Sequence, residues 1–200
     1  MSKLSEMNTP IFWVEGHPGD FDKEKWKIEV SGLVERPKNY SWEELMAFQK
    51  VTVEARLTSV TRWSVRGRWG GICLADILRD VGALPDGKFV RVWSCGLVYD
   101  TSIPWDIAMK EKTLLAYEFD EEPLGEDYGG PIRLFVPYLW GYKSAKSVVK
   151  IEITEKYITG YWEKRGYTDS AKILPGRVLD VNTGKVRPIP GGEVIKFEDQ

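Results

Sequence analysis

The chain has 200 residues, of which 42% are hydrophobic and 29% charged, and its formal net charge is −2. This length and balance are typical of one folded domain with a substantial core, and the near-neutral charge argues against a dedicated nucleic-acid-binding module. No stretch of about 18 apolar residues occurs, so we expect no membrane span. The first residues contain neither an apolar signal core nor twin arginines, which favours a cytoplasmic location.

Two cysteines and one histidine, His17, are the only residues of those types. They form no CxxC pair and no Cys/His cluster, so a zinc site built from them is not expected. We predict free thiols, as is usual in the cytoplasm. Lysine and glutamate are abundant while asparagine and glutamine are scarce, a composition that resembles thermophilic proteins.

Local patterns predict many short strands and few helices. Ser41 and Glu44 have the spacing of a capping box that opens a short helix over 41–48, and Gly82 is expected to end a second helix over 72–84. A short helix is also expected within 100–110, after a strand end. Alternating or apolar runs predict strands at 25–34, 50–60, 89–96 and 113–125, and two more within 131–156 around a Gly/Lys/Ser loop.

These elements predict the fold class. Helices are too few and too short for repeated βαβ units, so we expect a mixed, mostly β α+β domain. We place this domain at 1–168. An irregular C-terminal extension, 169–200, is expected to pack on it, with one hairpin candidate at the sequence NTG, 182–184.

A basic loop in the second half suits an anion. Arg133 follows a Gly-Gly-Pro turn, and the loop 141–146, which begins eight residues later, combines small residues with Lys143, Ser144 and Lys146. Small residues let backbone N–H groups approach a phosphate, and lysines supply charge. The spacing is not that of a Walker loop. An exposed basic hairpin is an equally weighted alternative.

The stretch 56–71 holds four arginines, two tryptophans and no carboxylate. It could stack the bases of a single nucleic-acid strand, or pack its tryptophans inward with arginines in solvent. We favour a pocket wall in which Arg62 binds an oxyanion while Trp63 and Trp69 exclude water, because a second anion-compatible loop occurs in the same domain. Hydrolase motifs are lacking: there is no GxSxG elbow, no histidine in a triad pattern and no paired carboxylates.

Seven pieces of the chain, in order, resemble the molybdopterin-binding oxidoreductase domain of the sulfite oxidase family. They are similar above all to its short single-domain members and to methionine-sulfoxide-reductase catalytic subunits. The resemblance covers roughly 12–168 and is most specific over 114–153. The pieces are WKIEVSGLVERP, SWEEL, LTSVTRWSV, RWGGICLADIL, LLAYEFDEEPLGEDYGGPIRLFVP, GYKSAKSVVKIEI and GYWEKRGY.

The resemblance implies a mostly β fold around one buried pyranopterin that carries molybdenum, or tungsten. It implies that Ser94 lies beside the metal-side end and that Arg133 and residues 144–146 hold the phosphate. Tyr128 stands where the family usually has Asn or His, and residues 12–14 align with a segment that lies over the pterin. The candidate cofactor-binding residues are Phe12, Trp13, Val14, Ser94, Tyr128, Arg133, Lys143, Ser144, Ala145 and Lys146.

The chain departs from the family pattern at Ser59. The pattern has a cysteine before Val-Thr-x-Trp-Ser, and its thiolate is the only protein ligand to the metal. A serine hydroxyl has a far higher pKa than a thiol and is a poor ligand for such a metal. Ser59 could ligate as an alkoxide, the protein could bind cofactor without conventional turnover, or the serine could be a Cys→Ser change. Cys73 follows the RWGG segment and cannot take this position, whereas Cys95 on a neighbouring strand could approach the centre.

The predicted function is therefore a molybdopterin-dependent oxidoreductase that transfers an oxygen atom to or from a small oxyanion or sulfoxide-type substrate. Ser59 takes the metal-ligand position and Arg62 faces the substrate, while a separate redox protein exchanges electrons. The main alternative is a non-catalytic molybdopterin-binding protein without the cysteine ligand. A single-strand nucleic-acid binder that uses 56–71 is a third hypothesis, although we expect no nucleic-acid partner.

Overall fold

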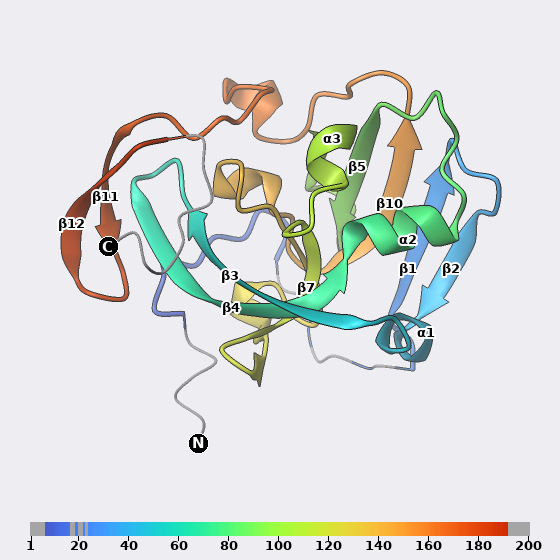
Figure 1. Cartoon of the computed structure of the whole chain (residues 1–200), viewed down its shortest axis with the longest axis horizontal. Coiled ribbons are helices and arrows are strands. Elements are labelled where there is room, and N and C mark those ends of the chain that lie inside the picture. Colours follow the sequence, from blue (N-terminus) through green and yellow to red (C-terminus); the bar gives the residue numbers. More distant parts are fainter. Residues whose placement is uncertain (1–6, 17–18, 20–21, 23, 192–200) are drawn as a thin grey trace.

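The computed structural model describes residues 7–16, 19, 22 and 24–191, so His17 lies outside the described residues. A five-stranded sheet forms one end of the molecule (Figure 1). In spatial order its strands are β2 (Lys38–Ser41), β1 (Lys27–Gly32), β10 (Val148–Thr154), β5 (Phe89–Ser94) and β6 (Asp100–Pro104). Within this sheet β1 runs parallel to β10, and the other neighbours are antiparallel.

A second, seven-stranded sheet is built around β4 (Trp63–Cys73), which pairs antiparallel with β3 (Lys50–Thr58) and β7 (Leu114–Phe119). The short strands β8 (Glu122–Pro123) and β9 (Arg133–Phe135) pair with β7. At the start of β4, the strand β11 (Gly176–Asp180) pairs in parallel with β4. On its other side β11 pairs antiparallel with β12 (Lys185–Ile189).

Helices are short and follow strands. They are α1 (Trp42–Met46), α2 (Leu74–Asp80) and α3 (Trp105–Ala108), with 3-10 turns η1 (Glu126–Tyr128), η2 (Gly141–Lys143) and η3 (Glu163–Arg165). The capping box is confirmed: the Ser41 hydroxyl accepts from the Glu44 amide at 3.2 Å, and the Glu44 carboxylate accepts from the Ser41 amide at 2.9 Å. Gly82, with φ +64°, follows the end of α2 as predicted. The mostly β α+β class is confirmed, and no helix among the described residues has the length and hydropathy of a membrane span.

A compact aromatic cluster holds the second sheet together. The Trp69 ring is fully buried, stacks on Phe135 with ring centroids 4.1 Å apart, and meets Phe119 edge-on at 4.9 Å. Trp69 therefore joins β4, β7 and β9 as a core residue. The expectation that Trp69 forms a pocket wall was wrong, because Phe119 and Phe135 pack against its ring and leave it fully buried in the core.

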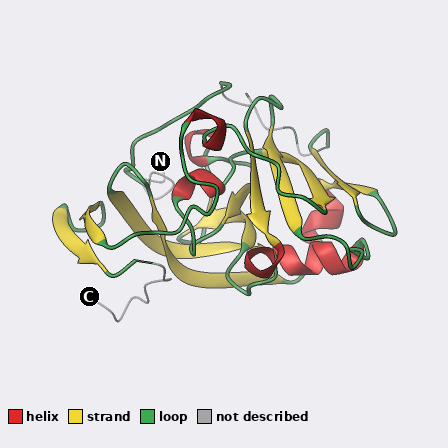
Figure 2. Cartoon of the chain, turned by 90° about the horizontal axis from the view of Figure 1, so that it is seen from above, coloured by secondary structure: helices red, strands yellow, loops and turns green. Residues whose placement is uncertain are grey.

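The C-terminal extension is less irregular than expected, since the hairpin candidate at NTG is the turn between β11 and β12. Figure 2 shows this hairpin at the end of the molecule away from the five-stranded sheet. A buried ion pair, Arg56 to Asp180 at 2.9 Å, fixes β11 against the β3–β4 hairpin. Arg56 is thus a structural residue, and the positive charge at this point of the 56–71 stretch is neutralised.

Candidate functional site

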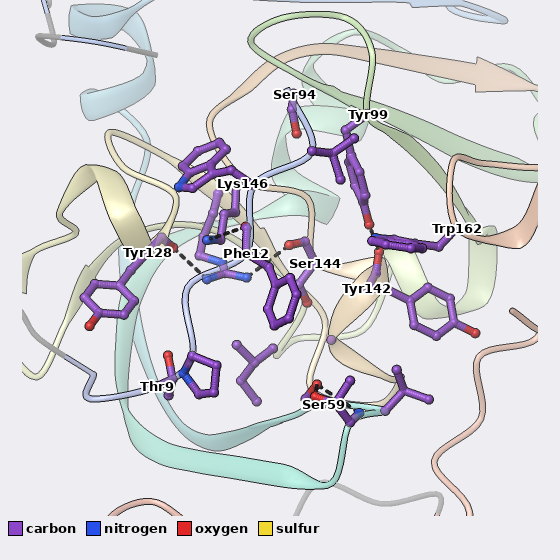
Figure 3. Close-up of a pocket in the computed structure, with 18 of the residues that line it drawn as sticks. Thr9, Phe12, Ser59, Ser94, Tyr99, Tyr128, Tyr142, Ser144, Lys146 and Trp162 are labelled. Carbon is purple, nitrogen blue, oxygen red and sulfur yellow. Dashed lines mark hydrogen bonds between the residues drawn. The ribbon is translucent and has the colours of Figure 1, made fainter. Parts of the chain in front are cut away.

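A cavity with an empty volume of about 1030 Å³, part of it open to solvent, lies where loops from both sheets meet. Its walls come from the N-terminal segment, the β3–β4 loop, the end of β5, and loops near η1, η2 and η3 (Figure 3). Most of the predicted site residues line it, namely Phe12, Trp13, Val14, Ser59, Ser94, Tyr128, Arg133, Ser144 and Lys146.

Arg133 supplies one buried positive charge at this cavity. Its side chain is 3% exposed and donates to the carbonyls of Tyr128 at 2.6 Å and Ser144 at 3.0 Å. Its guanidinium carbon lies 5.7 Å from the centre of the Trp69 ring. Burial lowers the pKa of Arg133 to about 10, so the group keeps its charge at neutral pH.

Lys146 supplies a second positive charge beside it. Its ammonium donates to the carbonyls of Phe12 at 3.0 Å and Asp127 at 2.5 Å, and it lies 4.6 Å from the centre of the Trp13 ring. Burial, and then the charge of Arg133, lower the pKa of Lys146 to about 7, opposed only by the Asp127 carboxylate. At neutral pH the cavity therefore places a partly protonated Lys146 beside the charged Arg133, and an anion between them would favour the charged form of Lys146.

Neither cation forms an ion pair with a carboxylate of the described residues; their hydrogen-bond acceptors are carbonyl oxygens. Charges removed from water are costly unless an opposite charge compensates them. The arrangement is therefore suited to an anion entering the cavity, and a phosphate group fits because it accepts several charge-assisted hydrogen bonds.

Ser59 lies in the loop between β3 and β4. Its amide donates to the Trp63 carbonyl at 2.8 Å, and its hydroxyl lies 2.8 Å from the Thr61 hydroxyl and accepts from the Thr61 amide at 3.2 Å. Figure 3 shows Ser59 and Ser94 on different sides of the pocket in that view, with Ser94 near Tyr99. The side chains of Leu57, Val60 and Trp63 line the cavity beside this loop.

Three predicted residues do not line this cavity. Arg62 adopts φ +70° at the end of the loop, and its guanidinium carbon lies 5.5 Å from the centre of the Trp140 ring. It borders a separate shallow pocket between the N-terminal segment and the β11–β12 hairpin. Ala145 is buried, and its carbonyl accepts from the Leu134 amide at 2.8 Å.

Lys143 is the third, and its charge is already compensated. Its fully buried ammonium pairs with the Glu163 carboxylate and donates to the Ser102 carbonyl at 2.9 Å and the Tyr157 hydroxyl at 3.0 Å. Burial lowers the pKa of Lys143, while Glu163 opposes that shift. The pair connects η2 with η3, so Lys143 contributes to the site by joining two of its walls.

Sequence reasoning missed an aromatic wall formed by residues far apart in the chain. Trp162 stacks on Tyr167 with ring centroids 5.2 Å apart, and Tyr167 lies 5.0 Å from Tyr142. All three line the cavity, as does Tyr99. The recurring Gly-Tyr pairs of GYK and GYWEKRGY were the available signal.

The two cysteines are free, and neither lines the cavity. Burial raises the pKa of both thiols. The Cys95 sulfur lies 3.8 Å from the Glu15 carboxylate, and Cys73 precedes α2. No group of three or more His, Cys, Asp or Glu side chains suited to a metal ion occurs among the described residues.

One family pattern, described as "Oxidoreductase molybdopterin binding domain", matches residues 15–162. The chain is 33% identical to YuiH of Bacillus subtilis, named an uncharacterized oxidoreductase, over 76% of this chain and 78% of YuiH. It is 31% identical to MsrP, the protein-methionine-sulfoxide reductase catalytic subunit of Campylobacter jejuni, over 72% of this chain and 54% of MsrP.

Among solved structures, the sulfane dehydrogenase SoxCD of Paracoccus pantotrophus shares the fold, with a TM-score of 0.68 and 22% identity. The match covers 86% of this chain and 46% of that chain, so this chain spans about half the length of the SoxCD and MsrP chains. The chain belongs to the oxidoreductase molybdopterin binding domain family, which implies molybdopterin with molybdenum as its cofactor.

Proposed function

We propose that this protein is a molybdopterin-dependent oxidoreductase that transfers an oxygen atom to or from a sulfoxide-type substrate. The observation that carries the proposal is the pair of cations, Arg133 and Lys146, which lie side by side in the cavity without a carboxylate partner among the described residues. We assign them to the phosphate of the cofactor.

Other cavity residues could bind the remaining parts of the molybdopterin cofactor. The Ser144 hydroxyl accepts from the Val136 amide at 3.0 Å and still has a proton to donate to the phosphate. Phe12, Trp13 and Val14 offer apolar surface to a flat pterin ring. When bound, the cofactor supplies the two-electron chemistry of its metal; the chain binds it, orients it and excludes water.

The side chains near Ser59 favour a neutral substrate over an oxyanion. Leu57, Val60 and Trp63 line this part. Of the two arginines three residues from Ser59, Arg56 is paired with Asp180 and Arg62 lines a different pocket. An oxyanion such as sulfite needs cationic or N–H donors, whereas a sulfoxide flanked by carbon groups suits aromatic and aliphatic walls. The MsrP relative, a methionine-sulfoxide reductase by name, supports the same choice.

We assign Ser59 to the position facing the metal. The hydroxyl is engaged with Thr61, which favours the second candidate function, cofactor binding without turnover. Molybdenum is the metal proposed, with tungsten as the alternative that elemental analysis separates.

The test compares wild type, Ser59→Cys and an exposed control, Ser170→Cys. Each purified protein is analysed for pterin fluorescence after oxidation, for molybdenum and tungsten by mass spectrometry, and for reduction of methionine sulfoxide and oxidation of sulfite with artificial electron carriers. We expect about one pterin per chain in all three and a preference for the sulfoxide. Absence of pterin would refute the proposal, and bound metal that strong reductant never reduces would select the non-catalytic function.

A separate redox protein is part of the proposal, because oxygen-atom transfer moves two electrons that a second protein must supply or accept. A cytoplasmic location is proposed as well, supported by the two free thiols. Fractionation of cells that express the whole gene tests the location, and recovery outside the cytoplasm would contradict it.

A further inference from the structure

The N-terminal segment Thr9–Glu15, here called the N-terminal wall, forms one side of the cavity. Thr9, Pro10 and residues 12–15 all line it. Figure 3 shows the segment running from Thr9 past Phe12 towards Ser94. The wall contains no helix or strand, and no backbone–backbone hydrogen bond joins it to another described residue. Side-chain contacts therefore hold this wall in place.

Glu15 makes the most concentrated of these contacts. One carboxylate oxygen accepts from the Gly96 amide at 2.8 Å, and the other accepts from the amides of Val98 at 2.8 Å and Tyr99 at 2.7 Å. Successive backbone N–H groups that converge in a turn form an anion-binding concavity. In this protein the anion bound in that concavity is the Glu15 carboxylate, which belongs to the N-terminal wall.

The turn that receives Glu15 belongs to the framework of the fold. It joins β5 to β6, which pair antiparallel. The Ser94 amide donates to the Tyr99 carbonyl at 3.0 Å, and the Leu97 amide donates to the Ser94 carbonyl at 3.0 Å. These bonds keep the turn in shape whether or not Glu15 is present, so only the wall is free to leave.

The N-terminal wall is also held from the cofactor site, through a hydrogen bond from Lys146. Lys146 donates to the Phe12 carbonyl at 3.0 Å, and the Phe12 side chain is 64% exposed. Of the wall's apolar side chains, Val14 packs against the core, so Phe12 contributes little to holding the segment. Segments without backbone pairing can open locally without unfolding of the core.

We propose that Glu15 is a positioning residue that fastens the N-terminal wall over the cofactor cavity, and that its release from the β5–β6 turn opens the path by which the cofactor enters and leaves. The proposal rests on the proposed function for the identity of the ligand. The hydrogen-bonded contact between Glu15 and the turn is independent of that identity.

The first test measures amide hydrogen exchange by NMR in the cofactor-free protein, with Glu15→Ala and Glu15→Gln. We expect the Gly96, Val98 and Tyr99 amides to exchange at least about tenfold faster in Glu15→Ala, since each loses a charge-assisted hydrogen bond. Glu15→Gln, which keeps one carbonyl oxygen, should be intermediate. The Leu97 amide serves as an internal control, because its acceptor is the Ser94 carbonyl.

A second substitution weakens the same contact from within the β5–β6 turn. A Cβ at Gly96 would lie 3.0 Å from the Glu15 carboxyl carbon, so in Gly96→Ala the carboxylate must shift by a few tenths of an ångström, which lengthens its hydrogen bonds to the turn without altering a cavity residue. Gly125→Ala is the matched control, since φ is −68° there and nothing lies within 4 Å of the added Cβ.

The second readout is the rate at which bound pterin leaves the loaded protein, followed by its fluorescence after release and oxidation. Glu15→Ala and Gly96→Ala should release it about tenfold faster than wild type and Gly125→Ala. Unchanged exchange at the three amides would overturn the proposal, and so would faster exchange with unchanged pterin release. Wild-type protein without pterin would contradict the proposed function, while the exchange test on the cofactor-free protein would still decide the role of Glu15.

Discussion

Replacing Lys146 with methionine tests the two-cation site most sharply. The pKa of Lys146 is lowered from 10.5 to about 7, so above pH 7 the folded protein loses a proton that the unfolded chain still holds. The free energy of unfolding must therefore rise with pH between about pH 7 and pH 10. At about 1.36 kcal/mol per pKa unit, wild type gains on the order of 2 kcal/mol between pH 7 and pH 9 from this group. Solvent screening of a partly exposed side chain reduces the gain to about 1 kcal/mol.

The assay is urea unfolding of the cofactor-free wild type and Lys146→Met at pH 7, 8 and 9. Methionine also loses the hydrogen bonds to the Phe12 and Asp127 carbonyls, so the comparison rests on how the free energy of unfolding changes from pH 7 to pH 9 and not on its value at one pH. Lys172→Met, at an exposed position, should follow wild type at all three pH values. Parallel curves for wild type and Lys146→Met would refute the reasoning about burial and repulsion.

The same variant should bind the cofactor less tightly. An ammonium that meets a phosphate contributes about 1.5–3 kcal/mol through charged hydrogen bonds, so pterin retained after gel filtration should fall about tenfold or more. Retention equal to wild type would show that Lys146 does not contact the phosphate.

Two further predictions concern buried ion pairs. Glu163→Gln leaves the fully buried Lys143 without its counter-charge and should lower the unfolding free energy by about 3–5 kcal/mol; a loss under 1 kcal/mol in urea unfolding would contradict this. Asp180→Asn removes the buried partner of Arg56 and should cost about 3 kcal/mol. It should also expose the β11–β12 hairpin to limited proteolysis, and an unchanged cleavage pattern would argue against its role in fixing that hairpin.

Local features of the fold could be predicted from the sequence because their causes are local. The Ser41–Glu44 capping box, the end of α2 near Gly82 and the alternation of β1 each depend on residues a few positions apart. Most of the predicted site residues line the cavity, because the motifs that resemble the family mark the loops that converge on it.

Other features depend on pairings across long stretches of chain. Lys143 and Lys146 look alike in the sequence, but Glu163 compensates only the first. Arg62 lines another pocket because the loop after β3 turns through a positive φ that sequence alone does not reveal. The role of Glu15 depends on a turn more than 80 residues away, and no local pattern carries that information.

The central claim is that the cavity binds molybdopterin with its phosphate at Arg133 and Lys146. The most direct test is a crystal structure of the cofactor-loaded protein, with anomalous scattering measured at the molybdenum and tungsten edges. The account predicts one metal peak inside the cavity, on the side of Ser59, and a phosphate within hydrogen-bond distance of Lys146 and Arg133. A metal peak outside the cavity, or a phosphate bound away from these two residues, would contradict it.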